Sequence, residues 1–296
     1  MFKHLFGGLT VCSMPFLACG QPARQDGNTA VRWTYSADVS HSFDSSLERG
    51  SSEFGDFNAT LHRGQVTALI PWRETQSWSV GPLWEFGHFN AGSSAPVPED
   101  VYSAALRLGY GAQFKEHWSF RAEIRPGLYS DFEDISFDDF NAPVLLTLTY
   151  QVNPRLLLAL GLNVNLRSDL ATIGGPGVRW QFADDWTLNL FLPKPTVERT
   201  INDSVSIYAG GEWRSSAFRL AEDFGSRRGR PRLNDEDFSY RELRVLAGTR
   251  WQVSPALGVA LEGGCAFQRK MEFRQADTAF NADGAPFVQF VASGSF

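Results

Sequence analysis

Hydrophobic and polar residues alternate along most of this chain with a period of two. Between Val31 and Ser40, every odd-numbered residue is apolar and every even-numbered residue is polar or charged. A similar alternation runs from Leu158 to Asn165, where leucine or valine alternates with alanine, glycine and asparagine. A β-strand directs successive side chains to opposite faces. The pattern therefore predicts strands with one apolar face and one polar face.

The alternation recurs often enough to predict about fourteen strands, or about twelve as the alternative count, and no stretch of helical period competes with it. The connections between these strands alternate in length. Short turns are predicted at 73–76, 115–117, 153–154, 183–185, 202–203 and 254–255, and long loops at 42–53, 90–99, 131–142, 220–238 and 274–285. Short turns at one end and long loops at the other are typical of an up-and-down barrel in the bacterial outer membrane.

The second predicted strand contains a shift in the phase of its alternation. From Phe57 to Leu61 the apolar residues occupy odd positions, whereas from Val66 to Ile70 they occupy even positions. One extra residue in a strand would return the apolar side chains to a single face. We therefore predict a β-bulge at Gly64.

The polar face decides between a soluble barrel, with apolar side chains inside, and a membrane barrel, with apolar side chains outside. Charged residues occupy this face in the middle of many strands. They are Arg107, Arg121, Glu123, Arg125, Arg179, Glu212, Arg214, Glu242, Arg244, Arg250 and Glu262. Long apolar ladders would leave a large exposed patch on a soluble barrel, whereas hydrocarbon accommodates them and requires a closed barrel. We predict an all-β fold, a closed antiparallel up-and-down transmembrane β-barrel, in preference to a secreted β-sandwich.

Both ends of the chain agree with this prediction. Residues 1–20 have a basic start, an apolar stretch and a small-x-small cleavage site, which are typical of a secretory signal peptide. Residues 21–30 would follow as a periplasmic lead-in, and residues 31–296 as the barrel. The closing strand has Phe290 and the terminal Phe296 on one face, the arrangement expected of an insertion signal for the barrel-assembly machinery. Cys19 beside the cleavage site leaves lipidation open.

The composition excludes several classes of function. The formal net charge of −6 argues against a nucleic-acid partner, and no run of about 20 apolar residues predicts a transmembrane helix. No cofactor or metal motif is present, and Cys265 is the only cysteine after the signal peptide. His41, His62, His88 and His117 have no serine at the spacing of a phospholipase, deacylase or protease site. We expect no enzymatic activity and no cofactor, with a lipid-modifying enzyme as a remote alternative.

The charged residues of the polar face would line the lumen, where acids and arginines roughly balance. Paired charges in a confined space brace the wall, whereas separated charges along a pore select the solutes that pass. A barrel of about fourteen strands lies between filled eight-stranded barrels and open sixteen-stranded porins. The strand number leaves both possibilities open, and the balance of charges favours a braced wall with a narrow or plugged pathway.

Two predicted outer loops carry clustered charges. The loop at 131–142 contains five acids, which suit either divalent cations that bridge lipopolysaccharide phosphates or simple solvation. The loop at 220–238 contains four arginines, which suit contact with anionic glycolipid, a plug that folds into the acidic rim, or a mobile loop. Outer-membrane lipid and lipopolysaccharide are therefore expected partners, together with an unidentified small solute.

Three stretches of the chain resemble a known family. They are Leu192-Pro193-Lys194-Pro195, Ile207-Tyr208-Ala209-Gly210-Gly211-Glu212-Trp213 and Ser239-Tyr240-Arg241-Glu242-Leu243-Arg244-Val245. In these stretches, and over most of the chain after the signal peptide, the sequence is similar to the outer-membrane β-barrel family called domain of unknown function 6268. The resemblance implies a location and an architecture, and it supplies no activity or functional residues.

The sequence thus predicts a barrel of the Gram-negative outer membrane with two functional interpretations. The first is a passive channel or transporter for small solutes. The second is a structural or surface-interaction barrel with a filled lumen.

Overall fold

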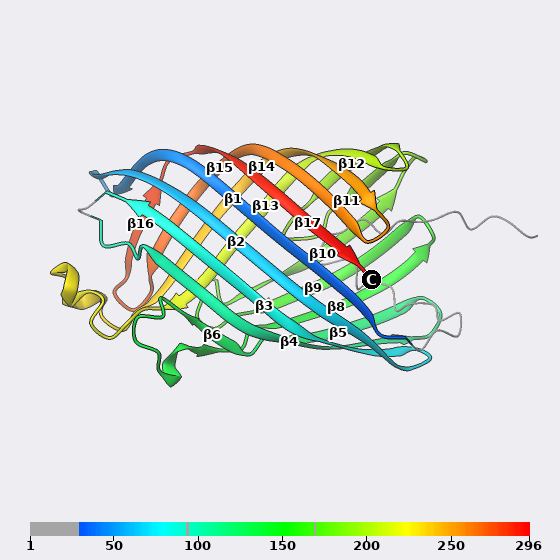
Figure 1. Ribbon diagram of the computed structural model, residues 1–296, viewed down its shortest axis with the longest axis horizontal. Coiled ribbons are helices and arrows are strands. Elements are labelled where there is room, and N and C mark those ends of the chain that lie inside the picture. Colours follow the sequence, from blue (N-terminus) through cyan, green and yellow to red (C-terminus); the bar gives the residue numbers. More distant parts are fainter. Residues whose placement is uncertain (1–29, 93–94, 169) are drawn as a thin grey trace, which may run out of the picture.

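The computed structural model describes residues 30–92, 95–168 and 170–296, which form one closed β-barrel (Figure 1). The signal peptide predicted for residues 1–20, and the predicted lead-in up to residue 29, lie outside the described residues. The strands tilt across the barrel, and the long connections gather at one end (Figure 1). We call this end the loop end and the opposite end, with the short connections, the turn end.

Strands make up most of the described chain. They are β1 (Arg32–Arg49), β2 (Ser52–Arg73), β3 (Gln76–Ala91), β4 (Asp100–Phe114), β5 (Trp118–Ile124), β6 (Gly127–Ser130), β7 (Phe140–Asn141), β8 (Val144–Asn153), β9 (Leu156–Val164), β10 (Thr172–Gln181), β11 (Trp186–Asn189), β12 (Thr196–Asn202), β13 (Val205–Arg219), β14 (Asp237–Ser254), β15 (Leu257–Phe273), β16 (Thr278–Ala282) and β17 (Ala285–Ser295). Three short 3₁₀ turns are η1 (Phe137–Asp139), η2 (Ser226–Arg228) and η3 (Pro231–Leu233). Within the described part of the chain, no helix has the length and apolar character needed to cross a membrane.

The first strand closes the barrel, because β1 pairs with β2 along one edge and with β17 along the other. At the turn end, the backbone N–H of Trp33 donates to the carbonyl of Phe296 at 2.8 Å. Three wall strands are interrupted and continue as a second segment, namely β5 with β6, β7 with β8, and β16 with β17. The 17 segments of the sheet therefore form 14 wall strands. This confirms the predicted architecture and its larger strand count.

The apolar ladders point out of the barrel, as predicted. Leu158, Leu160 and Leu162 on β9 are 40%, 58% and 38% exposed, whereas the inward Glu123 and Arg244 are each 2% exposed. Apolar side chains outside and polar side chains inside are the reverse of a soluble barrel. They match a wall whose outer surface lies in hydrocarbon.

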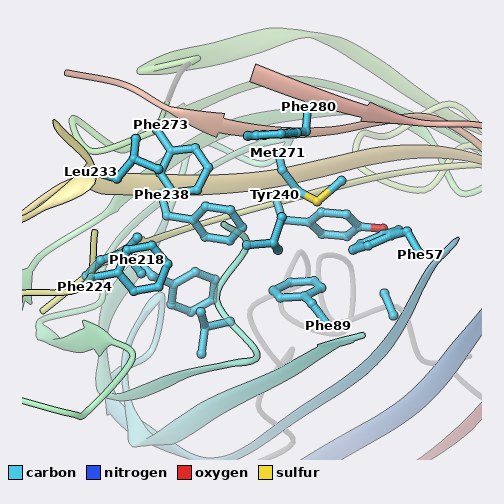
Figure 2. Close-up of a cluster of buried hydrophobic side chains, with 14 of the residues drawn as sticks. Phe57, Phe89, Phe218, Phe224, Leu233, Phe238, Tyr240, Met271, Phe273 and Phe280 are labelled. Atoms are coloured by element: carbon cyan, nitrogen blue, oxygen red, sulfur yellow. The ribbon is translucent and has the colours of Figure 1, made fainter. Parts of the chain in front are cut away.

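Apolar side chains also fill the lumen at the loop end. Phe89 and Tyr240 have ring centroids 4.9 Å apart, and Phe238 and Phe273 have centroids 5.4 Å apart. Figure 2 shows these rings gathered into one cluster, together with side chains from the segment that follows β13. We call the cluster the loop-end core. Its large members are Phe57, Phe89, Phe218, Phe224, Leu233, Phe238, Tyr240, Met271, Phe273 and Phe280.

The loop-end core explains the phase shift in β2. The ladder between β1 and β2 passes Gly64 without a change of register, so the prediction of a β-bulge there is wrong. Odd residues of β2 point inward on both sides of Gly64: Phe57 and Leu61 enter the loop-end core, and Thr67 faces the polar lumen. The side chains that β2 meets inside the lumen change along the strand. They are apolar near the loop end and polar toward the turn end.

The strands near the loop end are longer than the sequence predicts. β1 continues to Arg49 and β2 begins at Ser52, so a tight hairpin replaces the loop predicted at 42–53. A register shift between Ser42 and Ser45 accommodates the extension of β1. Serine, aspartate and glutamate in this stretch resemble a loop because the strands here carry polar residues on their outer face.

Candidate functional site

The inward-facing charges of the lumen form three clusters. In the first, Glu123 on β5 accepts hydrogen bonds from Arg125 at 2.7 Å, from Arg121 at 2.9 Å and from Arg107 on β4 at 3.0 Å. Alternation on β5 places residues 121 and 123 on one face, Arg125 follows directly after the strand, and pairing with β4 brings Arg107 beside them. We call this group the Glu123 cluster. It combines three positive charges with one negative charge.

The second cluster lies between β13, β14, β17 and β1. Its members are Asp38, Glu212, Arg214, Glu242, Arg244 and Gln289, and we call it the Arg214 cluster. Arg214 donates to Asp38 at 2.7 Å and to Glu212 at 3.0 Å. Arg214 and Arg244 both donate to Oε1 of Gln289 at 2.7 Å. Both arginines are only 2% exposed, so these charge-assisted hydrogen bonds hold four strands together inside the lumen.

Strand β13 also contacts the strands on the far side of the lumen. Ser216 on β13 donates to Glu85 on β3 at 2.6 Å, and Arg63 on β2 donates to the same carboxylate at 3.0 Å. Nearer the loop end, Arg219 of β13 forms a parallel bridge with Ser130 of β6. These strands are not consecutive around the barrel. Side chains therefore fill the lumen between β13–β17 and β1–β3, which we call the braced half.

The third cluster is nearer the turn end. Lys194 lies 2.5 and 2.7 Å from the two carboxylate oxygens of Glu262, and Tyr208 donates to Glu262 at 2.5 Å. Arg250 donates to Glu198 at 2.9 Å. Sequence reasoning placed Glu262 and Arg250 on the polar face and missed Lys194. Lys194 lies in the connection between β11 and β12, where no alternation assigns a side chain to either face.

Arg179 on β10 stands apart from the three clusters, although the sequence grouped it with the other lumen charges. It pairs in the sheet with the buried Asn189, while its neighbour Trp180 is 47% exposed on the outer face. Alternation therefore directs Arg179 inward. Within the described ranges of the chain, its side chain has no hydrogen-bond or ion-pair partner.

The wall from β8 to β11 carries a row of small side chains across the middle of its inner face. Gly161 on β9 pairs with Gly175 on β10, and the adjacent Leu160 is exposed on the outer face. A Cβ atom at either glycine would meet no atom within 4 Å. The inward Thr147 and Ala159 also retain partial exposure. Both glycines therefore border open space inside the barrel, and we call this wall the glycine half.

The glycine half contains the shortest strand pair of the barrel wall. β11 has 4 residues, and the connection after it exposes Leu190 and Leu192 by 47% and 49%. The β11–β12 hairpin therefore ends within the apolar outer surface of the barrel. Two stretches lie between this hairpin and the loop end. Among the described residues, the part of β10 at 172–177 pairs only with β9, and the part of β13 at 215–218 pairs only with β14. The hydrogen-bonded wall is interrupted between β10 and β13 on the side of the loop end.

The β9–β10 loop extends across the loop end. Arg167 in this loop donates to the carbonyl of Phe140 at 3.0 Å and to the carbonyl of Asp138. Its guanidinium also lies 3.9 Å from the carboxylate of Asp237 on β14. In the same loop, the carbonyl of Leu166 accepts a hydrogen bond from Arg274. These contacts tie Leu166 and Arg167 to η1, β7, β14 and the connection after β15 at the loop end.

The acidic and basic loops identified in the sequence contact each other. Asp131 accepts a hydrogen bond from the backbone N–H of Ala221 at 3.0 Å, and Arg227 forms an ion pair with Glu133. Burial raises the pKa of the Asp131 carboxyl. Within the described residues, no group of three or more histidine, cysteine, aspartate or glutamate side chains has the geometry to hold a metal ion. The charges of these loops join β6–β7 to β13–β14.

The histidines on the strands lie on the outer face of the wall. Nδ1 of His88 lies 2.8 Å from Asp100, and Nδ1 of His41 lies 2.9 Å from the hydroxyl of Thr60. The ring of His62 packs beside the ring of Phe86 at a centroid distance of 5.7 Å on the outer face. None of these side chains joins the lumen clusters.

A comparison with family models finds a match over most of the chain. A model of the family described as Domain of unknown function (DUF6268) matches residues 73–293. No curated protein matches the chain.

Among solved structures, the chain is similar to an outer membrane channel from Pseudomonas putida F1, with 9% identity and a TM-score of 0.49 over 93% of this chain and 99% of that chain. It is also similar to the Pseudomonas putida toluene transporter TodX, with 10% identity and a TM-score of 0.41 over 91% of this chain and 90% of that chain. For the Ralstonia pickettii toluene transporter TbuX, the identity is 9% and the TM-score 0.41, over 91% and 90% of the two chains. Likenesses this distant do not bear on what the present chain binds or transports.

Proposed function

The chain belongs to the DUF6268 family, and we propose that it is a passive channel for small solutes in the bacterial outer membrane. The observation that carries this proposal is the open space on the inner side of Gly161 and Gly175. Unfilled space inside a protein loses the dispersion contacts that side chains would make. A barrel that served only as a scaffold would be expected to fill it.

The pathway runs along the glycine half, beside the braced half. The inward Arg121 and Thr147 retain partial exposure. In the braced half, Ser40 is 1% exposed and Gln289 is 2% exposed. Solvent therefore reaches the row around Gly161 and Gly175, whereas Thr149 and Asn189 on the same wall are buried. Because the loop-end core closes the braced half, solutes enter where the wall is interrupted between β10 and β13.

The proposal is tested by recording purified full-length mature protein in planar lipid bilayers. The wild-type barrel is expected to show stepwise conductance. Gly161→Trp and Gly175→Trp place a large side chain in the open space and should each reduce the conductance severalfold. Leu160→Trp is the matched control, because the adjacent Leu160 is 58% exposed on the outer face. That variant should conduct like the wild type.

Two outcomes would overturn the channel. One is a wild-type barrel without stepwise conductance, which would favour the second interpretation, a structural barrel with a filled lumen. The loop-end core and the Arg214 cluster are the features that favour that alternative. The other outcome is equal conductance in Gly161→Trp, Leu160→Trp and the wild type, because the open space would then not carry the solute.

The location and assembly of the barrel belong to the same proposal. The outward apolar ladders support a position in the outer membrane, reached through the signal peptide of residues 1–20. Phe290 and Phe296 are 47% and 71% exposed on the outer face of the closing strand. That position suits the proposed insertion signal for the barrel-assembly machinery. Lipopolysaccharide is the expected neighbour of the loop end, and whether Cys19 is lipidated stays a separate prediction.

A further inference from the structure

Positive charge is unevenly divided between the two halves of the lumen. The ion-paired side chains of the braced half include equal numbers of each sign, with Arg63, Arg214, Arg244 and Arg269 against Asp38, Glu85, Glu212 and Glu242. The third cluster is also balanced, with Lys194 and Arg250 against Glu198 and Glu262. Two other sites are not balanced: the Glu123 cluster, with three arginines on one carboxylate, and Arg179, which has no partner among the described residues. Among these side chains, the excess positive charge therefore belongs to the Glu123 cluster and Arg179.

Both sites border the glycine half. β5, which contains Arg121 and directly precedes Arg125, lies next to β8 in the wall, and β10, with Arg179, follows β9. Pairing across these strands places Arg121, Thr147, Gly161 and Gly175 in one row. Long basic side chains thus lie on either side of the small residues Thr147, Gly161 and Gly175. The lumen next to Gly161 and Gly175 is open space.

An ion in that space meets the arginines and not the acid. The side chain of Glu123 is 1% exposed, whereas those of Arg121 and Arg125 are 15% and 31% exposed. Guanidinium groups form charge-assisted hydrogen bonds with carboxylate and phosphate oxygens. A narrow lumen with walls of low dielectric constant also concentrates the field of such groups.

We propose that the glycine half is an anion-selective pathway. Arg179 on one side, and Arg121 and Arg125 on the other, favour small anions with carboxylate or phosphate groups over cations and neutral solutes. The inference rests on the proposed channel function and names the class of solute for it.

The test is the reversal potential of the full-length mature protein in planar bilayers under a KCl gradient. The dilute side is kept below about 0.1 M, where the Debye length is about 10 Å or more. The wild type should show the sign expected for chloride permeating better than potassium. Arg179→Gln and Arg121→Gln should each move the reversal potential toward zero, and the double variant should move it further. Thr147→Asp should act in the same direction, because it adds a negative charge to the row without removing an arginine.

The matched control removes the same charge outside the pathway. Arg73 lies at the β2–β3 turn, with its guanidinium carbon 4.6 Å from the ring centroid of Trp72, and Arg73→Gln should leave the reversal potential unchanged.

In about 1 M KCl, where the Debye length falls to about 3 Å, the anion preference of the wild type should shrink. Exchanging chloride for acetate or for inorganic phosphate then shows which of the two anion classes permeates better.

A preference of the wild type for potassium would overturn the inference. So would one reversal potential shared by the wild type, Arg179→Gln, Arg121→Gln and Thr147→Asp. In either case the channel itself would stand. Absence of any conductance would instead contradict the channel, so the two failures are distinguishable. Heat-modifiable migration on SDS gels verifies that each variant is folded before its potential is interpreted.

Discussion

At the scale of single residues, arginines in the two halves of the lumen have different surroundings. Arg244 is 2% exposed and lies 2.5 Å from a carboxylate oxygen of Glu242. Arg179 has no partner among the described residues. Removing one member of a buried ion pair leaves an uncompensated charge, whereas removing a solvated, unpaired side chain leaves nothing unpaired. The cost of losing an arginine should therefore differ between the two halves.

Arg244→Ala should lower the free energy of unfolding by about 3–5 kcal/mol, because it leaves the buried Glu242 without its closest cation. Arg179→Ala should change the same quantity by about 0.5 kcal/mol or less. Urea unfolding in lipid vesicles, followed by tryptophan fluorescence, measures both. Equal losses in the two variants would contradict the division of the lumen into a braced half and a solvated half.

Gly64 shows how a single residue can mislead sequence reasoning. A Cβ atom there would come within 2.1 Å of the ring of Trp84, which is 44% exposed on the outer face. Glycine leaves room for this ring to lie over β2. The sequence suggested a bulge because a glycine coincided with the change of phase, and β-bulges often contain glycine.

At the scale of elements, apolar burial holds the segment between β13 and β14 at the loop end. Phe224 and Leu233 in this segment are 1% and 4% exposed within the loop-end core. Arg227 forms ion pairs with Glu133 and Asp223, but the side chains of all three are between 42% and 65% exposed. Exposed ion pairs contribute little to stability. The core, rather than the charges, should keep the segment in place.

Phe224→Ala should destabilise the loop-end core by about 3–5 kcal/mol, the cost of a large-to-small substitution at a buried phenylalanine. Arg227→Ala should cost about 1 kcal/mol or less. Limited proteolysis between β13 and β14 measures local opening, and it should be faster only in Phe224→Ala. Faster cleavage of Arg227→Ala alone would show that the ion pairs, and not the core, anchor the segment.

At the scale of the whole molecule, connections from distant parts of the wall meet over the glycine half. Arg167 joins the β9–β10 loop to the carbonyl of Phe140 and approaches Asp237 at 3.9 Å. The approach to Asp237 on β14 spans the strands β11 to β13, where the wall is interrupted. We therefore expect the segment around Arg167 to limit entry to the proposed pathway.

Arg167→Ala should raise the single-channel conductance or the open probability, because it frees this loop from its partners. The stability of the barrel should change little, since the contacts of Arg167 lie outside the wall ladders. Bilayer recording measures the first effect, and heat-modifiable migration on gels measures the second. A variant with unchanged conductance and gating would show that the loop does not limit entry.

Much of the wall, and part of the site, was predictable from local pattern. Alternation placed Glu123 on the inner face and Leu160 on the outer face, because the direction of a side chain on a strand depends only on its position along that strand. The contact between Ser216 and Glu85 joins residues 131 positions apart, and no local pattern reports it. The division of the lumen into two halves was therefore not predictable.

The sequence by itself determined the antiparallel barrel, its strand count and the charged rows, because a period of two is a local property of the chain. Only the tertiary structure decided which apolar faces contact lipid and which form the loop-end core. Lipid and a protein core both remove apolar surface from water, so Phe57 and Leu160 follow the same rule from opposite sides of the wall. The open space at Gly161 and Gly175 likewise depends on the tertiary structure. It is set by how closely β13 approaches β2 and β3, and by which side chains extend across the lumen.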